Sequence, residues 1–266
     1  MLLVITALPS GSPSLDDAAA RQVAAAVGLS PAEVRMRLAG RLPRALLSRG
    51  GGAREWGDAT AALRAAGFAT LTCDPGAAPS DAERVVGRRV EMTGAGPGGG
   101  DRLLVWDGAD ACHAVRRGDV TLIQSGARIT IDRRQVTTEK QRLDPGRAIL
   151  SGGLILTRKV TSSSTLTSET REPFLLLHRA DDSDVILYER RLDYRFLGAD
   201  MQPSSHANFQ RLTARVRGFC PGVAFDERVA QPGFVAGLPP TSADPTDLSL
   251  YLVALAHRAL TAARPT

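Results

Sequence analysis

Hydrophobic and polar positions in the first 73 residues change period several times, and each change coincides with a helix or strand breaker. Leu2 to Leu8 is an apolar run of strand length that stops at Pro9. Pro43 to Leu47 and Phe68 to Cys73 read as two further strands. Helical patterns separate the three runs, at Leu15 to Val27, Pro31 to Gly40 and Arg54 to Ala66. The predicted order is β-α-α-β-α-β.

Capping residues support this order. Ser14, with Asp17 three residues on, is a candidate start of the first helix, which Gly28 ends. Ser30 and Glu33 form a capping box around Pro31 and predict the start of the second helix.

The segment resembles the C-terminal domain of the bacterial ribosomal stalk protein over about a quarter of the chain. The matching residues are Gly28-Leu29, Pro43 before a strand, and the helix end Leu63 to Gly67. The resemblance implies a ferredoxin-like-type βααβαβ domain over residues 1–74 that serves as a small interaction module. The factor-binding face of that family depends on lysines, for which Arg35, Arg37 and Arg41 are the nearest substitutes here.

Residues 75–84 read as a linker by composition, and the pattern then changes to β. The candidate strands are Val85 to Met92, Arg102 to Trp106, the surroundings of Ala114 and Val115, Asp119 to Gln124, Arg128 to Gln135, Ala148 to Leu156, Phe174 to Arg179 and Val185 to Glu189.

A helix capped by Ser204 or Ser205 follows these strands, with Phe209, Leu212, Val216 and Phe219 as one apolar stripe. In element order, residues 85–230 resemble a bacterial pleckstrin-homology-like (PH-like) barrel closed by a helix. A two-sheet sandwich with a helical lid is the alternative. Residues 231–266 read as a Pro/Gly-rich connector and a docking helix from Asp247 to Ala263. The fold class is therefore α+β, with a mainly antiparallel barrel or sandwich after the first domain.

Composition is that of a soluble globular protein, with 43% hydrophobic and 23% charged residues. The net charge of +5 is concentrated in residues 116–159, which hold ten basic and four acidic residues. Such a segment can attract phosphates of nucleic acid or anionic lipid, or it can be a solvated sheet face. The candidate anion-binding residues are Arg116, Arg117, Arg128, Arg133, Arg134 and Arg158.

Three separate cysteines, Cys73, Cys112 and Cys220, suggest reduced thiols rather than a disulfide framework or a zinc site. The N-terminal run lacks a basic flank and is too short for a signal peptide, and no window approaches a membrane span. These features favour a cytoplasmic location.

Catalytic and cofactor motifs give little signal. Gly94 to Gly99 fits the spacing G-x-G-x-x-G, but a strand-like segment follows it, so we interpret it as a hairpin loop with no cofactor. The four histidines lack metal-ligand spacing, and His113 beside Cys112 points to the opposite face of a strand. Asp181 to Asp184 read as a turn, and the Ser/Thr run from Thr157 to Thr170 as an exposed loop or edge strand.

The most site-like set is Tyr188, Arg190, Arg191 and Tyr194, because aromatic faces beside guanidinium groups can hold an anion or a peptide carboxylate. We therefore expect a non-enzymatic interaction or regulatory protein that binds a protein or peptide. Phosphate-directed binding of nucleic acid or anionic lipid, and an enzyme without a recognisable motif, are the alternatives.

Overall fold

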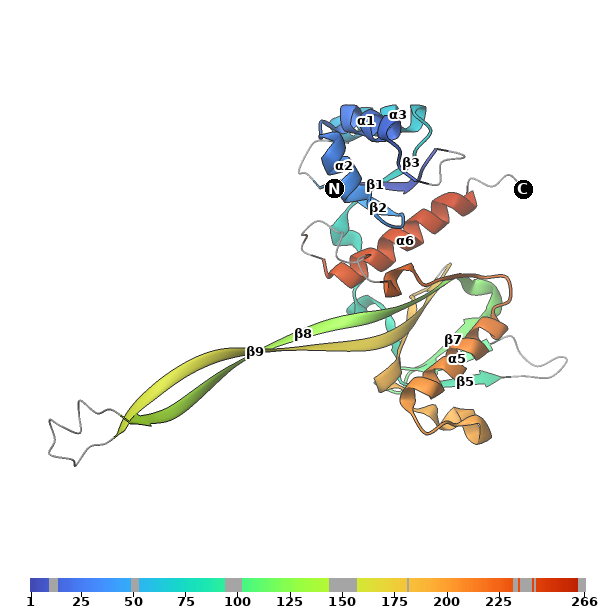
Figure 1. Ribbon diagram of the computed structural model, residues 1–266. Helices are drawn as coiled ribbons and strands as arrows, with labels where there is room; N and C mark the ends of the chain where they lie inside the picture. Colours follow the sequence, from blue (N-terminus) through green and yellow to red (C-terminus); the bar gives the residue numbers. More distant parts are fainter. Residues whose placement is uncertain are drawn as a thin grey trace. The chain divides into compact units, whose positions relative to one another are not determined.

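The structure, a computed structural model, describes residues 1–9, 14–48, 53–93, 102–143, 157–180, 182–231, 234, 241 and 243–262. The chain divides into two compact units, one of residues 1–128 with 172–266 and one of residues 129–171. The described residues form helices and three sheets, which confirms the α+β class (Figure 1).

The first 73 residues have the predicted β-α-α-β-α-β order. The elements are β1 (Leu2–Ala7), α1 (Asp17–Val27), α2 (Pro31–Leu38), β2 (Arg44–Ser48), α3 (Ala53–Ala65) and β3 (Ala69–Cys73). β1 lies in the middle of an antiparallel sheet with the order β2-β1-β3. Leu3, Ile5 and Phe68 pack with the helices, while Leu2, Val4 and Cys73 belong to a separate cluster on the other side of the strands.

Two helix starts show how local chemistry sets these boundaries. The predicted capping box is present at α2, where the Glu33 backbone N–H donates to Ser30 Oγ and the Ser30 backbone N–H donates to Glu33 Oε2. The prediction of Ser14 as the start of α1 is wrong. Asp16 is the cap, and its carboxylate accepts a 2.7 Å hydrogen bond from the Ala19 backbone N–H, so the helix begins at Asp17.

Two further sheets follow in the sequence. Their strands are β4 (Val85–Gly87), β5 (Arg89–Thr93), β6 (Arg102–Trp106), β7 (Cys112–Arg116), β8 (Val120–Leu143), β9 (Thr157–Arg179), β10 (Val185–Tyr188) and β11 (Ala224–Asp226). One sheet has the order β11-β8-β9-β10-β4 and the other β5-β6-β7. Strands β4 to β11 thus form two sheets, and within the described residues they do not close into a barrel.

Gly87 lies where the chain leaves the five-stranded sheet for the three-stranded one. A Cβ atom at this position would lie 2.4 Å from Leu187 Cδ2 and 2.8 Å from Val105 Cγ1. Only glycine lets the two sheets approach this closely.

Helix α5 (Ser205–Phe219) packs on the core that both sheets share. Its buried residues Phe209, Leu212 and Val216 belong to the same cluster as Val90 of β5 and Leu187 of β10. Phe219 is partly buried against that cluster, so the predicted apolar stripe is confirmed.

Residues 129–171 form the second unit, in which the distal parts of β8 and β9 pair as a two-stranded ribbon. The Ser/Thr run predicted as a loop or edge strand lies within β9. β10 pairs with β9 only at Phe174 to Leu177, so within the described residues the run has β8 as its one strand neighbour, as an edge strand does. The predicted strand Arg128 to Gln135 is part of one longer strand, β8. The predicted strand Ala148 to Leu156 and the loop Gly94 to Gly100 lie outside the described residues, as does most of the predicted connector between 232 and 242.

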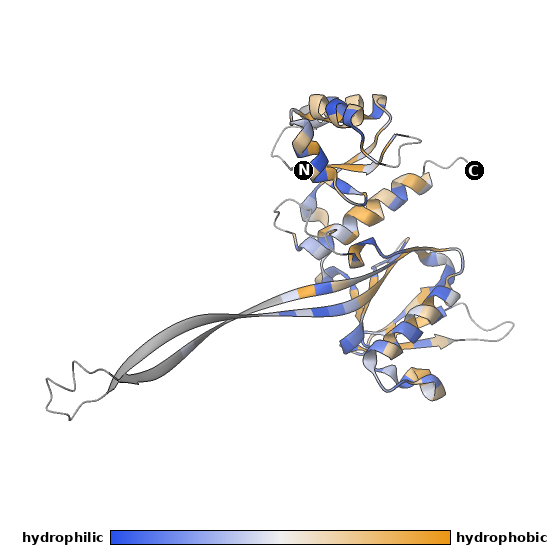
Figure 2. Cartoon of the chain, in the orientation of Figure 1, coloured by the Kyte–Doolittle hydropathy of each residue, from blue (hydrophilic) through white to orange (hydrophobic). Residues whose placement is uncertain are grey.

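Helix α6 (Pro245–Ala262) is apolar around most of its circumference (Figure 2). Leu248 and Leu252 pack with Leu2 and Val4 of β1, whereas Leu250 and Val253 belong to a cluster of the five-stranded sheet. A helix that buries different sides in this way connects the sheet β2-β1-β3 to the five-stranded sheet.

Candidate functional site

A buried group of charged and polar residues, here called the ionic cluster, lies at the N-terminal end of α6. It consists of Asp81, Arg84, Arg128, Tyr188 and Asp247. Asp247 receives hydrogen bonds from Arg84 at 2.5 Å and from Arg128 at 2.8 Å, while Asp81 receives one from Arg128 at 3.1 Å. The side chain of Arg84 is only 1% exposed and that of Asp247 6%. Such a group is stable only because each charge has a partner.

Proton affinities follow from this pairing. Burial alone lowers the pKa of Arg128, but the hydrogen bond to Asp247 and the nearby negative charges raise it above the ordinary value. Burial raises the pKa of Tyr188, and its hydrogen bond to Asp81 raises it further. The cluster therefore holds fixed charges and a neutral phenol, which suits a structural role.

The structure brings the predicted Tyr/Arg set together in an unexpected way. The Tyr188 hydroxyl donates to Asp81 Oδ2 at 2.8 Å and accepts from Arg128 Nε at 2.7 Å, and the buried Tyr194 hydroxyl donates to the Glu189 carbonyl at 2.7 Å. Arg191 lies over the Tyr188 ring at 4.1 Å from its centroid and pairs with Glu172. Arg190 is exposed. Both tyrosines are thus engaged within the chain.

The predicted anion-binding arginines lie in different surroundings. Arg128 belongs to the ionic cluster, whereas Arg116 and Arg117 are exposed at the end of β7 and in the turn after it. The Arg117 guanidinium lies 5.6 Å from the Phe219 ring centroid. Arg133, Arg134 and Arg158 lie in β8 and β9, with side chains outside the described part of the structure.

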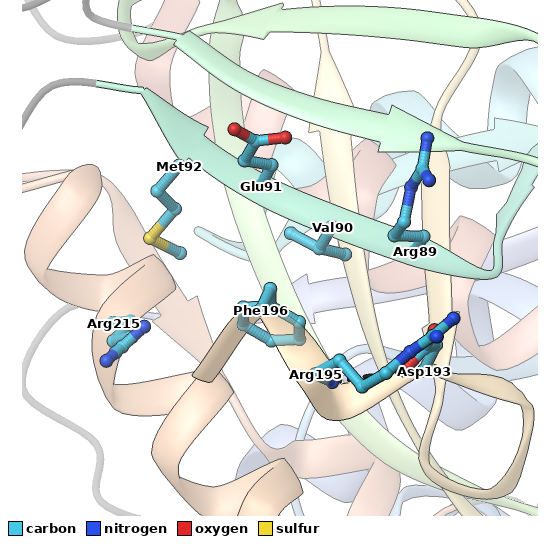
Figure 3. A pocket seen from close by; sticks show the side chains of 8 residues that line it. All are labelled: Arg89, Val90, Glu91, Met92, Asp193, Arg195, Phe196 and Arg215. Carbon is cyan, nitrogen blue, oxygen red and sulfur yellow. Dashed lines mark hydrogen bonds and ion pairs between the residues drawn. The ribbon is translucent and has the colours of Figure 1, made fainter. Parts of the chain in front are cut away.

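A separate cavity of about 600 Å³, here called the β5 groove, opens beside the edge strand β5. Its lining residues are Arg89, Val90, Glu91, Met92, Asp193, Arg195, Phe196 and Arg215. Figure 3 shows Val90 and Met92 on the side of β5 that faces Phe196, and Arg89 and Glu91 on the other. The groove therefore has an apolar middle.

Charged residues flank this apolar middle. Arg195 pairs with Asp193 and Arg215 with Asp200, and both arginines come from segments between β10 and β11. β5, residues 193–200 and α5 together carry five arginines and three carboxylates. Helix α5 itself has three arginines and no acidic residue. The groove lining itself contains three arginines and two carboxylates, which gives it a formal charge of +1.

The backbone of β5 provides the other half of the site. β5 pairs with β6 along all five of its residues, and its opposite edge meets a single parallel bridge between Arg89 and Asp193. There the Asp193 backbone N–H donates to the Arg88 carbonyl at 2.8 Å. Beyond this bridge, within the described residues, β5 has no second strand neighbour. Its outward N–H and C=O groups are free to pair with an extended chain.

Other candidate chemistry is accounted for within the chain. His113 Nε2 lies 3.0 Å from Asp107 Oδ2. The other carboxylate oxygen, Asp107 Oδ1, accepts hydrogen bonds from two backbone N–H groups of the same hairpin. Asp182 pairs with Arg179, and Asp184 with His178. Burial raises the pKa of the Cys73 and Cys220 thiols to about 11. The described residues contain no cluster of metal-ligating side chains.

Comparison of the chain with protein-family models, with curated proteins and with solved structures finds no match. Among the helices that the structure describes, none is both long enough and apolar enough to cross a membrane.

Sequence reasoning missed the β5 groove. Its residues come from three stretches, and no local pattern distinguishes an edge strand from a central one. The concentration of arginine without acid in α5 is the one signal that pointed there.

Proposed function

We propose that this chain is a non-enzymatic interaction protein that binds an extended, acidic segment of a partner protein in the β5 groove. The observation that carries the proposal is the free edge of β5 beside a cavity with an apolar middle and a lining of net positive charge. Addition of a strand to a sheet edge supplies main-chain hydrogen bonds, and side-chain pockets beside the edge supply selectivity.

The geometry favours an extended peptide over a small metabolite. The four residues of β5 beyond the bridge, Val90 to Thr93, offer alternate backbone groups over about 13 Å at 3.3–3.4 Å per residue. The groove runs beside β5, and Arg195 and Arg215 from other segments lie at the two ends of its apolar middle (Figure 3).

The finer fold assignments belong to the same proposal. The antiparallel order β2-β1-β3 with three helices supports a stalk-protein-like interaction domain at the N-terminus. The two sheets joined at Gly87 and covered by α5 support a PH-like architecture for the second domain. Three free cysteines support a cytoplasmic site of action.

The test is selection of peptides from a phage-displayed random heptapeptide library on the full chain. Selected peptides are then synthesised and their affinities measured by fluorescence anisotropy. Phe196→Ala should weaken binding about tenfold or more, since it removes most of an aromatic contact. Met201→Ala is the matched control, because Met201 is 53% exposed and does not line the groove.

Hydrogen exchange locates the bound peptide. The proposal expects added protection of backbone amides in β5. Recovery of no peptide, or protection elsewhere with β5 unchanged, would contradict it.

A second candidate function concerns residues 129–171. This segment carries eight basic and four acidic residues and forms a two-stranded ribbon. The major groove of duplex DNA admits such a ribbon, and contacts with phosphates make affinity fall steeply with salt. Replacing Arg133, Arg134 and Arg158 with glutamine in the full chain should then reduce the salt dependence of duplex binding. Binding to anionic vesicles instead of duplex would assign the ribbon to membranes.

A further inference from the structure

Arg215 stands out among the arginines of the β5 groove because its own partner is easily replaced. Its Nη2 lies 2.5 Å from Asp200 Oδ2, and the two side chains are 35% and 54% exposed. Among the residues that the structure describes, the Asp200 carboxylate has no further hydrogen bond or ion pair that would fix it. An exposed pair of this kind contributes only about 0–1 kcal/mol to stability.

Arg195, at the other end of the groove, differs in this respect. Its partner Asp193 accepts from the Arg195 backbone N–H at 3.0 Å and from its Nε at 2.7 Å. These hydrogen bonds lower the pKa of Asp193, and the Asp193 backbone is itself bonded to the β5 edge. Asp193 is thus built into the wall of the groove, whereas Asp200 is not among its lining residues.

We infer that Arg215 reads a carboxylate side chain of the bound segment and that Asp200 occupies Arg215 until the segment arrives. This inference rests on the proposed function and specifies its ligand. The bound carboxylate replaces that of Asp200 in a charge-assisted hydrogen bond, which is stronger where the peptide displaces water.

The arrangement also predicts where that carboxylate lies in the segment. Residues two apart on a strand point to the same face, about 6.6–6.8 Å apart. A segment with one apolar side chain over Phe196 can therefore place the acidic side chain two positions away, toward α5 and Arg215 (Figure 3). The ligand class is an extended peptide with an apolar residue and an Asp or Glu at this spacing.

The experiment repeats the heptapeptide selection on full-length protein with wild-type sequence, Arg215→Gln and Arg215→Glu. The wild type should enrich Asp and Glu at one position relative to the apolar residue. Arg215→Gln should lose that enrichment, and Arg215→Glu should replace it with Lys and Arg. Urea unfolding checks whether the substitutions change stability. The free energy of unfolding should be alike for all three proteins, because the Arg215–Asp200 pair is exposed.

Anisotropy then measures one selected peptide and its Glu-to-Gln version. Loss of the carboxylate should weaken binding about tenfold to wild type and leave binding to Arg215→Gln unchanged. Asp200→Asn should strengthen binding of the acidic peptide about two- to fivefold, since it removes the competing carboxylate. Asp17→Asn is the matched control, because Asp17 forms an exposed pair with Arg35 outside the groove.

The outcomes separate the two claims. Peptides that bind β5 without preference for acidic residues would overturn this inference and leave the proposed function standing. Failure to select any peptide would remove both. Weaker binding of the acidic peptide to Asp200→Asn would show that Asp200 assists the ligand. It would overturn the inference that the ligand carboxylate replaces that of Asp200 on Arg215.

Discussion

The ionic cluster and the β5 groove both contain arginine–carboxylate pairs, but these pairs differ in their exposure to water. In the cluster, Arg84 and Asp247 are almost fully buried and each charge has a short-range partner. Beside the groove, Asp200 pairs with the lining residue Arg215, and both side chains are partly exposed. The difference teaches that burial, rather than the presence of an Arg–carboxylate pair, decides whether such a pair holds the fold or remains available to a ligand.

The largest expected effect comes from breaking the cluster. Asp247→Asn leaves Arg84 and Arg128 buried beside a neutral amide, and we expect unfolding free energy to fall by about 3–5 kcal/mol, the usual cost of removing one partner of a buried pair. Urea unfolding followed by circular dichroism measures it. A loss below about 1 kcal/mol would show that the cluster is no more important than a surface pair.

A second substitution tests the contact between the three-stranded and the five-stranded sheet at Gly87. Gly87→Ala introduces a Cβ against Leu187 and Val105 and should cost about 1–3 kcal/mol by overpacking. Gly118→Ala is the control, because a Cβ there meets nothing within 4 Å. Equal midpoints of urea unfolding for the two variants would contradict the close approach of the sheets.

Acid should weaken the contacts that Asp184 makes with His178 and with the Arg179 backbone. Burial raises the pKa of Asp184, but contacts with His178 and the Arg179 backbone N–H outweigh burial and lower it below the ordinary value of 3.8. A carboxyl with a lowered folded-state pKa contributes stability above its unfolded pKa, and this contribution is lost as the pH falls through the folded pKa. Urea unfolding between pH 6 and about pH 3 should therefore show a steeper loss for wild type than for Asp184→Asn. Parallel curves would refute the assignment.

The smallest effect on stability is expected at Asp200, beside the β5 groove. Asp200→Asn should change unfolding free energy by no more than about 1 kcal/mol, as for other exposed pairs. Thermal unfolding checks it, with Asp17→Asn as a second exposed pair. A loss as large as that of Asp247→Asn would erase the distinction between the two regions.

How far the sequence predicts the molecule depends on the range of the contacts. The capping box at Ser30 and the stripe of α5 are local, because hydrogen bonds and apolar spacing within a few residues define them. The ionic cluster joins Arg84 to Asp247, 163 positions apart, and no periodicity encodes that meeting. The sequence predicts a ligand site at Tyr188 and Arg191 because it shows which residues are neighbours along the chain. It does not show that Asp81 and Arg128 both bond to the Tyr188 hydroxyl.

Helix α6 imposes an order on synthesis. A ribosome makes β1 more than 230 residues before the helix that covers its outer face, since Leu2 and Val4 pack with Leu248 and Leu252. Until α6 emerges, the sheet β2-β1-β3 presents this apolar face to solvent or to a chaperone, although α1, α2 and α3 already cover the other face. Both faces of the sheet β2-β1-β3 are therefore covered only after α6 has been translated and has docked between this sheet and the five-stranded one.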